Sequence, residues 1–177
     1  MMKRIINLYR RLFWSLEKQA IKAGVNIGQN NFISSRFWSS EPYLITIGNN
    51  CQITDDVIFY THGGAGAVRR EFPKFDTFGK IKIGNYVYIG NGVRIMPGVI
   101  IGDNVLIAAG SVVTKSIPSN VVVAGNPAKY ICSINEYLER NKKYNTDTKG
   151  LNANHKKRIL QNLPEEKFIH KDELRTK

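Results

Sequence analysis

Large apolar side chains recur at every sixth position through the middle of the chain. This frame runs through Ile47, Ile53, Phe59, Ile83, Ile89, Ile95, Ile101, Ile107 and Val113. Glycine, asparagine and aspartate stand between these positions, as in Gly102-Asp103-Asn104, where they favour tight turns. A short fixed period predicts an all-β solenoid, in which each repeat buries its apolar residue only by stacking on the next repeat.

The six-residue frame is interrupted twice. Ile27 stands two residues out of step with Ile47, which predicts an insertion around residues 34–43. The second interruption predicts an extended loop at residues 63–80, before the frame resumes at Ile83. A loop of this length inside a regular solenoid is typical of a functional or a disordered segment.

The pattern changes at both ends of the chain and predicts three regions. These are an N-terminal amphipathic helix at 1–23, the solenoid at 24–132 and a helical, polar extension at 133–177. In the first region, apolar residues fall at spacings of three or four, opposite a basic face. We expect this helix to cap the solenoid, because an uncovered β edge invites aggregation. Peripheral attachment to anionic lipid through the basic face is an alternative role, and the two are compatible.

The formal net charge of +12 over 177 residues is strongly positive. Because the basic residues are spread over both ends and the solenoid edges, without a repeated aromatic and basic platform, we do not expect a nucleic-acid partner. Cys51 and Cys132 offer neither a disulfide framework nor a zinc spacing. There is no run of about 18 apolar residues and no convincing secretory signal. A cytoplasmic location is therefore expected, with contact of the basic helix at the inner face of the membrane as an open alternative.

His62 is the only histidine within the repeats, and it stands at the root of the 63–80 loop. A lone histidine is more often structural than catalytic. The position of this one favours catalysis, since a loop rich in glycine, arginine and phenylalanine can cover a groove and exclude water. An unperturbed histidine, with a pKa of about 6.5, can act first as a base and then as an acid near neutral pH.

Several short motifs carry a resemblance to a known family. They are Ile83-Gly84-Asn85-Tyr86-Val87-Tyr88-Ile89-Gly90, Met96-Pro97-Gly98-Val99, Ala109-Gly110-Ser111-Val112-Val113-Thr114-Lys115 and Ala124-Gly125-Asn126-Pro127-Ala128-Lys129. Residues 25–132 resemble the hexapeptide-repeat acyltransferases of the maltose, galactoside and capsular-polysaccharide O-acetyltransferase group. The resemblance implies a left-handed parallel β-helix assembled as a homotrimer. It also implies acetyl-CoA as the acyl donor, in the groove between subunits, and no metal.

The same resemblance implies roles for individual residues. His62 would be the general base, taking the proton of an acceptor hydroxyl as that oxygen attacks the thioester of acetyl-CoA, with no acyl-enzyme. Residues at the positions that line the cofactor path in relatives are Asn91, Ala109, Thr114, Lys115 and Lys129. Asparagine, alanine and threonine are also ordinary turn residues of a solenoid. Cys132 replaces the second basic residue that relatives often carry three positions after Lys129.

The acceptor is expected to lie against aromatic and basic side chains near His62. The candidates are Phe37 and Trp38 from the 34–43 insertion, Arg69, Arg70, Phe72 and Phe75 from the loop, and Tyr88, which replaces a tryptophan common in relatives. Aromatic faces stack on pyranose rings, and arginines suit an acidic sugar or a linked phosphate. The loop and the tail look most like members found in capsule, O-antigen or exopolysaccharide synthesis. This likeness implies O-acetylation of a saccharide in a surface polysaccharide or its precursor.

Other functions remain open from the sequence. Sister groups use the same framework for N-acetylation of amino sugars or xenobiotics, and a purely binding solenoid is the non-enzymatic alternative. A hydratase like the γ-class carbonic anhydrases, which share this β-helix, needs three histidines at a subunit interface. With one histidine in the repeats, and His155 and His170 in the tail, that alternative is disfavoured.

Overall fold

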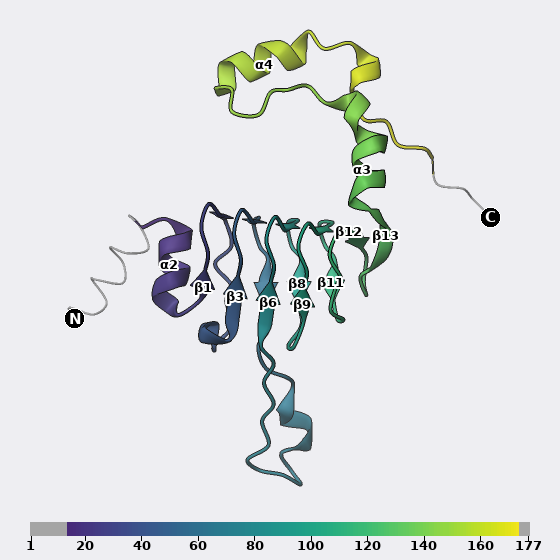
Figure 1. The fold of residues 1–177 in the computed structure, drawn as a ribbon. Coiled ribbons are helices and arrows are strands. Elements are labelled where there is room, and N and C mark those ends of the chain that lie inside the picture. The colour runs from purple at the N-terminus through teal and green to yellow at the C-terminus, as the bar shows by residue number, and fades with distance from the viewer. Residues whose placement is uncertain (1–13, 174–177) are drawn as a thin grey trace. The chain divides into compact units, whose positions relative to one another are not determined.

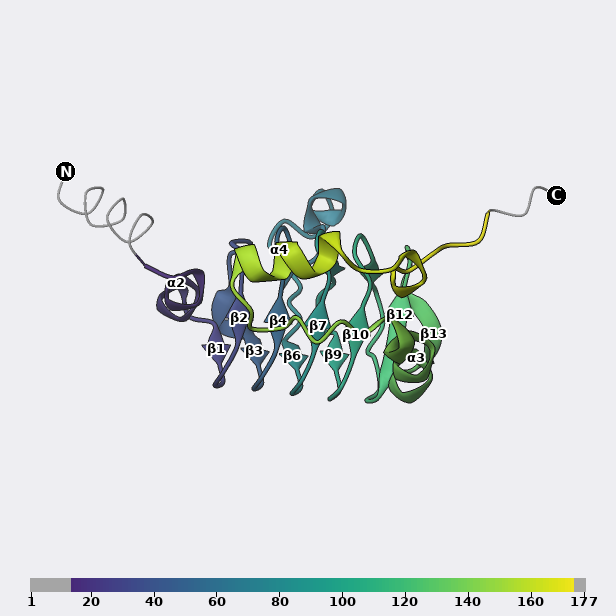
Figure 2. The same ribbon diagram turned by 90° about the horizontal axis from the view of Figure 1, so that it is seen from above.

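The computed structural model describes residues 14–173, so most of the predicted N-terminal helix lies outside the described residues. The chain divides into two units, Met1–Ile134 and Asn135–Lys177. The strands of the first unit form three sheets (Figures 1 and 2). The first sheet contains β1 (Asn26–Ile27), β3 (Ile45–Ile47), β6 (Ile81–Ile83) and β9 (Ile100–Ile101). The second contains β2 (Phe32–Ile33), β4 (Gln52–Ile53), β7 (Tyr88–Ile89), β10 (Leu106–Ile107), β12 (Val121–Ala124) and β13 (Lys129–Ser133). The third contains β5 (Ile58–Phe59), β8 (Arg94–Ile95) and β11 (Val112–Val113).

The chain enters the three sheets in rotation and adds one parallel strand to each sheet per turn. The register pairs Ile83 with Ile101, Ile89 with Ile107 and Ile95 with Val113, each 18 residues further along. Three hexads therefore make one coil, and the hexad frame predicted from the sequence is confirmed. Only β12 and β13 pair antiparallel among the described strands, at the last coil.

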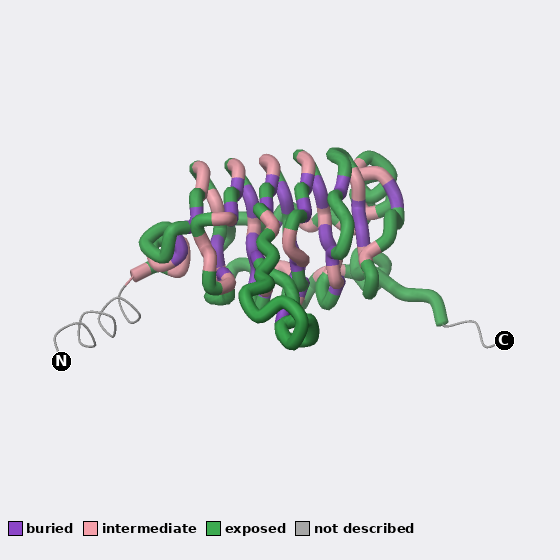
Figure 3. The backbone as a smooth tube through the Cα atoms, turned by 90° about the horizontal axis from the view of Figure 1, so that it is seen from below, coloured by how far each residue is buried: buried purple, intermediate pink, exposed green. Residues whose placement is uncertain are grey.

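The residues of the hexad frame form the core. Ile53, Ile89, Ile95 and Ile107 are each 0% exposed, because side chains from all three sheets point inward and stack from coil to coil. Figure 3 shows the buried segments repeating along the coils and alternating with more exposed corners. Burying an isoleucine side chain is worth about 1.5–3 kcal/mol, so the stacked frame supplies most of the driving force for this fold.

A polar ladder connects the coils at one corner. The carboxamide of Asn85 accepts from the backbone N–H of Asn49 at 2.9 Å, and Asp103 accepts from the backbone N–H of Asn85 at 2.6 Å. Gly84 belongs to the same corner, and a Cβ added there would lie 2.8 Å from the carbonyl carbon of Gly102. The corner is thus tight enough to exclude a side chain, and its own polar residues satisfy the backbone donors that the sheets leave free.

The predicted insertion in the first coil is confirmed. Ile27 pairs with Ile47 at a separation of 20 residues, two more than the 18 residues between Ile83 and Ile101 in the regular coil. Within the insertion, Phe37 forms a parallel bridge to Ile58 of β5. Trp38 is 7% exposed and stacks on Phe59, with 5.0 Å between ring centroids.

The prediction that Trp38 faces an acceptor cleft is therefore wrong. Phe37 pairs with Ile58 of the third sheet, so the next residue, Trp38, takes the inward position that Phe59 occupies in the second coil. An indole at that position is held by the core. The 3-10 helix η1 (Pro42–Leu44) then leads into β3.

Helix α2 (Leu16–Ala23) lies at the N-terminal end of the first unit. Ser15 caps it by accepting from the backbone N–H of Lys18 at 3.2 Å, and it ends at Gly24, which has a φ of 118°. Ala20 is 0% exposed and belongs to the same core as the first coils. The described part of the predicted helix therefore packs on the solenoid end, as a cap does; the alternative contact with lipid rests largely on residues outside the described part.

The C-terminal unit contains α3 (Ile134–Asn141) at its boundary, η3 (Lys142–Tyr144), α4 (Ala153–Gln161) and η4 (Glu165–Lys167). Asn152 caps α4 by accepting from the backbone N–H of His155 at 2.9 Å. Among residues 14–173, no helix combines the length and apolar character needed to cross a membrane.

Candidate active site

His62 lies at the neck of the long loop that follows β5. The backbone N–H of Gly63 donates to the carbonyl of Thr77 at 3.1 Å, and that of Gly79 donates to the carbonyl of Thr61 at 2.8 Å. His62 itself forms an antiparallel bridge with Phe78, and the two rings meet edge to face at 6.3 Å. Figure 1 shows the loop, which contains η2 (Ala65–Val68), projecting away from the stacked strands. The neck pairing therefore fixes the histidine on the rigid scaffold while the loop extends beyond it.

Gly79 anchors the return of the loop to the next coil. A Cβ added at Gly79 would lie 2.2 Å from the backbone nitrogen of Gly98, closer than any real contact. Glycine is therefore required at this position by close approach, and the backbone beside His62 is held against the coil that follows.

One nitrogen of the His62 ring is engaged by a carboxylate from the insertion. Nδ1 lies 2.9 Å from Oε2 of Glu41 and 3.4 Å from Oγ of Ser40. The same Glu41 oxygen accepts from the hydroxyl of Thr61 at 2.6 Å. The Glu41 side chain is 16% exposed and that of His62 is 43% exposed. An exposed imidazole with Nδ1 bound in this way keeps Nε2 available for an acceptor.

The hydrogen bond from Thr61, and next the one from His62, lower the pKa of Glu41 from its ordinary value of 4.5 to about 2. Glu41 is therefore ionised at neutral pH and can only accept hydrogen bonds. Our sequence reasoning missed this residue, because it considered only the aromatic side chains of the insertion. A signal was present, since Glu41 is the single carboxylate within residues 34–43.

Two of the predicted cofactor residues share the corner of His62. At this corner, the backbone N–H of Tyr60 donates to the carbonyl of Ile95, and that of Met96 donates to the carbonyl of Val113. These bonds stack Tyr60, Met96 and Thr114 on successive coils. Thr114 and the neighbouring Lys115 are exposed. They lie two coils beyond the histidine, about 10 Å at the usual spacing of parallel strands.

The other predicted cofactor residues lie elsewhere on the chain. Asn91 and Ala109 are exposed on adjacent coils at the corner between the second and third sheets, where the carbonyl of Asn91 accepts from Gly110 at 2.8 Å. A Cβ at Gly90 would lie 2.6 Å from the backbone nitrogen of Ala109, so this corner is closely packed. Lys129 is exposed on β13. The third sheet separates the Asn91 corner from the His62 corner, so one chain does not bring the two sets together.

The predicted acceptor residues are divided between the loop and two sheets. In the loop, Arg69 donates through Nε to the carbonyl of Phe75 at 3.2 Å, and Phe72 and Phe75 approach to 6.4 Å between centroids. Residues Glu71, Phe72, Pro73, Lys74 and Phe75 line a shallow hollow. Arg70 is exposed in the same segment, and Phe37 is 49% exposed beside the third sheet.

Tyr88 is 38% exposed on the second sheet, opposite Gln52 and Leu106. His62 lies instead at the corner between the third and first sheets, which is remote from Tyr88. Within one chain, Tyr88 and His62 therefore do not line the same cleft, and the prediction that they share an acceptor requires a second subunit.

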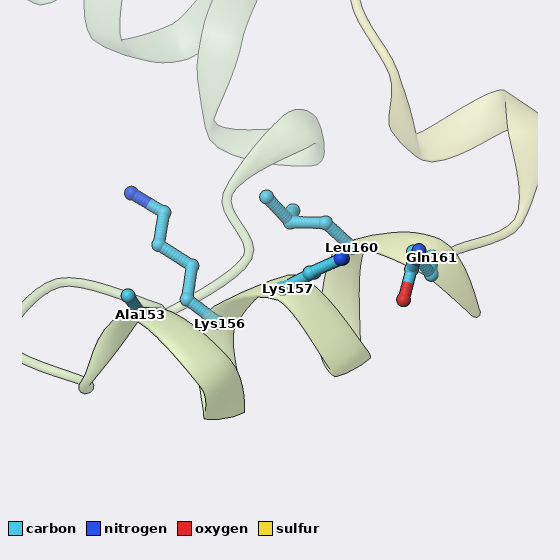
Figure 4. Close-up of a pocket in the computed structure, with 5 residues that line it drawn as sticks. All are labelled: Ala153, Lys156, Lys157, Leu160 and Gln161. Atoms are coloured by element: carbon cyan, nitrogen blue, oxygen red, sulfur yellow. The ribbon is translucent and has the colours of Figure 1, made fainter.

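A further hollow lies in the C-terminal unit and contains none of the predicted site residues. Figure 4 shows that it is formed along α4 by Ala153, Lys156, Lys157, Leu160 and Gln161. Across residues 14–173, no group of three or more histidine, cysteine, aspartate or glutamate side chains is arranged to hold a metal. Within the same residues, His62 and Glu41 bring an exposed imidazole and an ionised carboxylate to 2.9 Å, an arrangement suited to acid–base chemistry.

Known proteins are similar to this chain over its repeats and beyond. The sequence profile of the bacterial transferase hexapeptide (six repeats) family matches residues 80–115. Protein CapG of Staphylococcus aureus is 45% identical over 163 residues, which cover 86% of this chain and 95% of CapG. Galactoside O-acetyltransferase of Escherichia coli K12 is 41% identical over 116 residues, which cover 64% of this chain and 56% of that enzyme.

A solved structure is also similar. The hexapeptide-repeat acetyltransferase of Vibrio cholerae, in complex with acetyl-CoA, is 32% identical with a TM-score of 0.55. The match covers 62% of this chain and 60% of the Vibrio protein. This chain therefore spans little more than half of the galactoside and Vibrio enzymes, but nearly all of CapG. The resemblance inferred from the sequence is confirmed: the chain belongs to the hexapeptide-repeat acyltransferases of the maltose, galactoside and capsular-polysaccharide O-acetyltransferase group.

Proposed function

We propose that this acyltransferase moves an acetyl group from acetyl-CoA to a saccharide hydroxyl, with His62 as the general base. The observation that carries the proposal is the exposed imidazole at the loop neck, with Nδ1 held 2.9 Å from Glu41 and Nε2 left free. Family membership supports the acyl donor, since a relative has been solved with acetyl-CoA bound. The coils form a left-handed β-helix in this proposal, as in the group as a whole.

His62 supplies the proton transfers of the reaction. Nε2 takes the proton of the acceptor hydroxyl as the oxygen forms its bond to the thioester carbonyl carbon. The carbon–sulfur bond then breaks, and His62 returns the proton to the sulfur of CoA. A positioned base of this kind is worth about 10²–10⁴ in rate. The acetyl group passes directly from sulfur to oxygen, so no side chain of the protein is acylated.

The cofactor residues fit acetyl-CoA if a second copy of the chain takes part. Asn91 and Ala109 lie on one corner and His62, Thr114 and Lys115 on another, as the backbone pairing requires. A homotrimer would place the first corner of one subunit against the second corner of its neighbour and form a groove between them. Lys115 and Lys129 would then meet CoA phosphates, and the small Ala109 would admit the pantetheine arm.

The loop supports a saccharide acceptor. Phe72 and Phe75 are 60% and 41% exposed, which leaves aromatic faces free to stack on pyranose rings, and Arg70 adds a cation. We assign this acceptor to the synthesis of a surface polysaccharide, on the resemblance of the loop and tail to members with that role.

The experiment that tests this proposal measures thiol release from acetyl-CoA across neutral sugars, acidic sugars, amino sugars and xenobiotic amines. We expect activity with a neutral or acidic sugar, and acetyl ester in the product. Activity confined to amines would instead establish N-acetylation. Absence of thiol release, together with no protection of the protein by acetyl-CoA against heating, would favour a non-enzymatic binding protein.

A further inference from the structure

We infer that Glu41 is a positioning residue for His62: it holds the imidazole in the tautomer with the proton on Nδ1, so that Nε2 is the basic nitrogen. This inference rests on the proposed function and adds a residue to it. It also assigns a function to the two-residue insertion of the first coil, which contains Glu41.

The carboxylate of Glu41 is directed at His62 and not at its own helix. Glu41 precedes the 3-10 helix η1, but its side chain makes no capping hydrogen bond there. Only its backbone carbonyl serves the helix, accepting from Leu44 at 3.0 Å. The side chain instead crosses to the second coil, 21 residues further along, where it meets His62.

Thr61 fixes the carboxylate in place. The Thr61 side chain is fully buried, its residue being 0% exposed, and its hydroxyl donates to the oxygen of Glu41 that also faces His62. Ser39 lies 2.8 Å from the same hydroxyl. A carboxylate held by a buried donor loses little further freedom when it binds the imidazole, so it is preorganised to orient the ring.

The protonation states then determine the tautomer. Ionised Glu41 accepts and cannot donate, so the Nδ1 atom at 2.9 Å must carry a proton in the neutral ring. The other nitrogen is left with its lone pair, and the ring orientation is set by the same hydrogen bond. When Nε2 takes the acceptor proton, the nearby carboxylate stabilises the resulting imidazolium.

A structural ion pair that only fastens the insertion is the competing explanation. The chain contains a matched control, because Asp55 accepts from the Ser34 hydroxyl and also joins the insertion to the second coil. Asp55 makes this bridge without contacting His62. If Glu41 were merely a fastener, loss of either carboxylate would have the same consequences.

The test compares the full-length native protein with Glu41→Ala, Glu41→Gln and Asp55→Asn. Long-range ¹H–¹⁵N NMR reports the tautomer of each histidine, and His62→Ala identifies the resonances of that ring. We expect the Nδ1–H tautomer in the native protein and in Asp55→Asn. Glu41→Ala should shift His62 to the mixture that an exposed imidazole adopts in water. Glu41→Gln should keep the tautomer, because its amide oxygen still accepts, and it covers the case in which the alanine variant fails to fold.

Kinetics complete the test. We expect Glu41→Ala to lower kcat about 10- to 10³-fold, bounded by the loss in His62→Ala, with KM for acetyl-CoA within about twofold of native. Asp55→Asn should leave both constants unchanged. A native Nε2–H tautomer, or an unaltered tautomer and kcat in Glu41→Ala, would overturn the positioning role. Failure of the proposed function is distinguishable, since a native protein without transferase activity still reveals the tautomer by NMR.

Discussion

Neighbouring isoleucines on β9 offer a direct test of the inward and outward faces of the coils. Ile101 is 2% exposed, whereas Ile100 is 52% exposed on the outer face of the first sheet. Alanine at either position removes the same three carbon groups. The two variants therefore differ only in environment, which makes each a control for the other.

The magnitude follows from the packing. Three buried carbon groups at about 0.8 kcal/mol each give about 2.4 kcal/mol for Ile101→Ala. The stack adds a cavity cost, because Ile83 and Ile117 pair with Ile101 from the coils on either side, and this backbone pairing limits how far they can move into the space left. We therefore expect a loss of about 3–5 kcal/mol. Ile100→Ala should cost about 0.5 kcal/mol, as is usual for an exposed site.

Equilibrium urea unfolding of both variants measures this difference, at two protein concentrations so that any effect of assembly is separated from folding. A loss of this size is a large share of the total stability of a typical domain, about 5–15 kcal/mol, so it is readily resolved. Equal losses in the two variants, or a larger loss in Ile100→Ala, would refute the assignment of the hexad frame to the core.

Three further predictions concern the site. Gly79→Ala should reduce both stability and kcat, since its Cβ would lie 2.2 Å from the backbone of the next coil. Gly66→Ala should have little effect in the same thermal and kinetic assays, because its Cβ meets nothing within 4 Å. The pKa of Glu41 is about 2 in the folded protein against 4.5 ordinarily, so its stabilising contribution is complete above pH 4.5 and is lost as the pH falls towards 2. The free energy of unfolding in urea should therefore depend less on pH across this range in Glu41→Gln than in the native protein. An identical dependence would contradict the assignment. Lys115→Ala should raise the Kd for acetyl-CoA about tenfold by calorimetry, the value of one charge-assisted hydrogen bond, while Lys149→Ala in the C-terminal unit should not change it.

The hexad frame was predictable because burial in a solenoid is a local, periodic property. In the regular coil that begins at Ile83, each inward residue stacks on its counterpart 18 positions away. The positions of Ile83, Ile89 and Ile95 therefore assign each strand to its sheet without any knowledge of side-chain rotamers. The loop and the insertion were predictable for the same reason, as breaks in that period.

The contacts of the site were less predictable, because they depend on how the irregular segments fold. Trp38 was assigned to the acceptor cleft, but the first coil returns it to the core against Phe59. Glu41 meets His62 across 21 residues through the path of the insertion, which no local pattern specifies. The register pairs Tyr88 with Gln52, ten residues before His62, so Tyr88 and His62 fall on different sides of the coil.

His62 is the proposed base of the acetyl transfer. The most direct measurement is the kcat of His62→Ala with the best acceptor found, compared with native protein and with His155→Ala, which alters a histidine of the C-terminal unit. We expect kcat to fall about 10²- to 10⁴-fold in His62→Ala, with native-like kcat in His155→Ala and native-like acetyl-CoA binding in both. Native kcat in a folded His62→Ala would contradict this role.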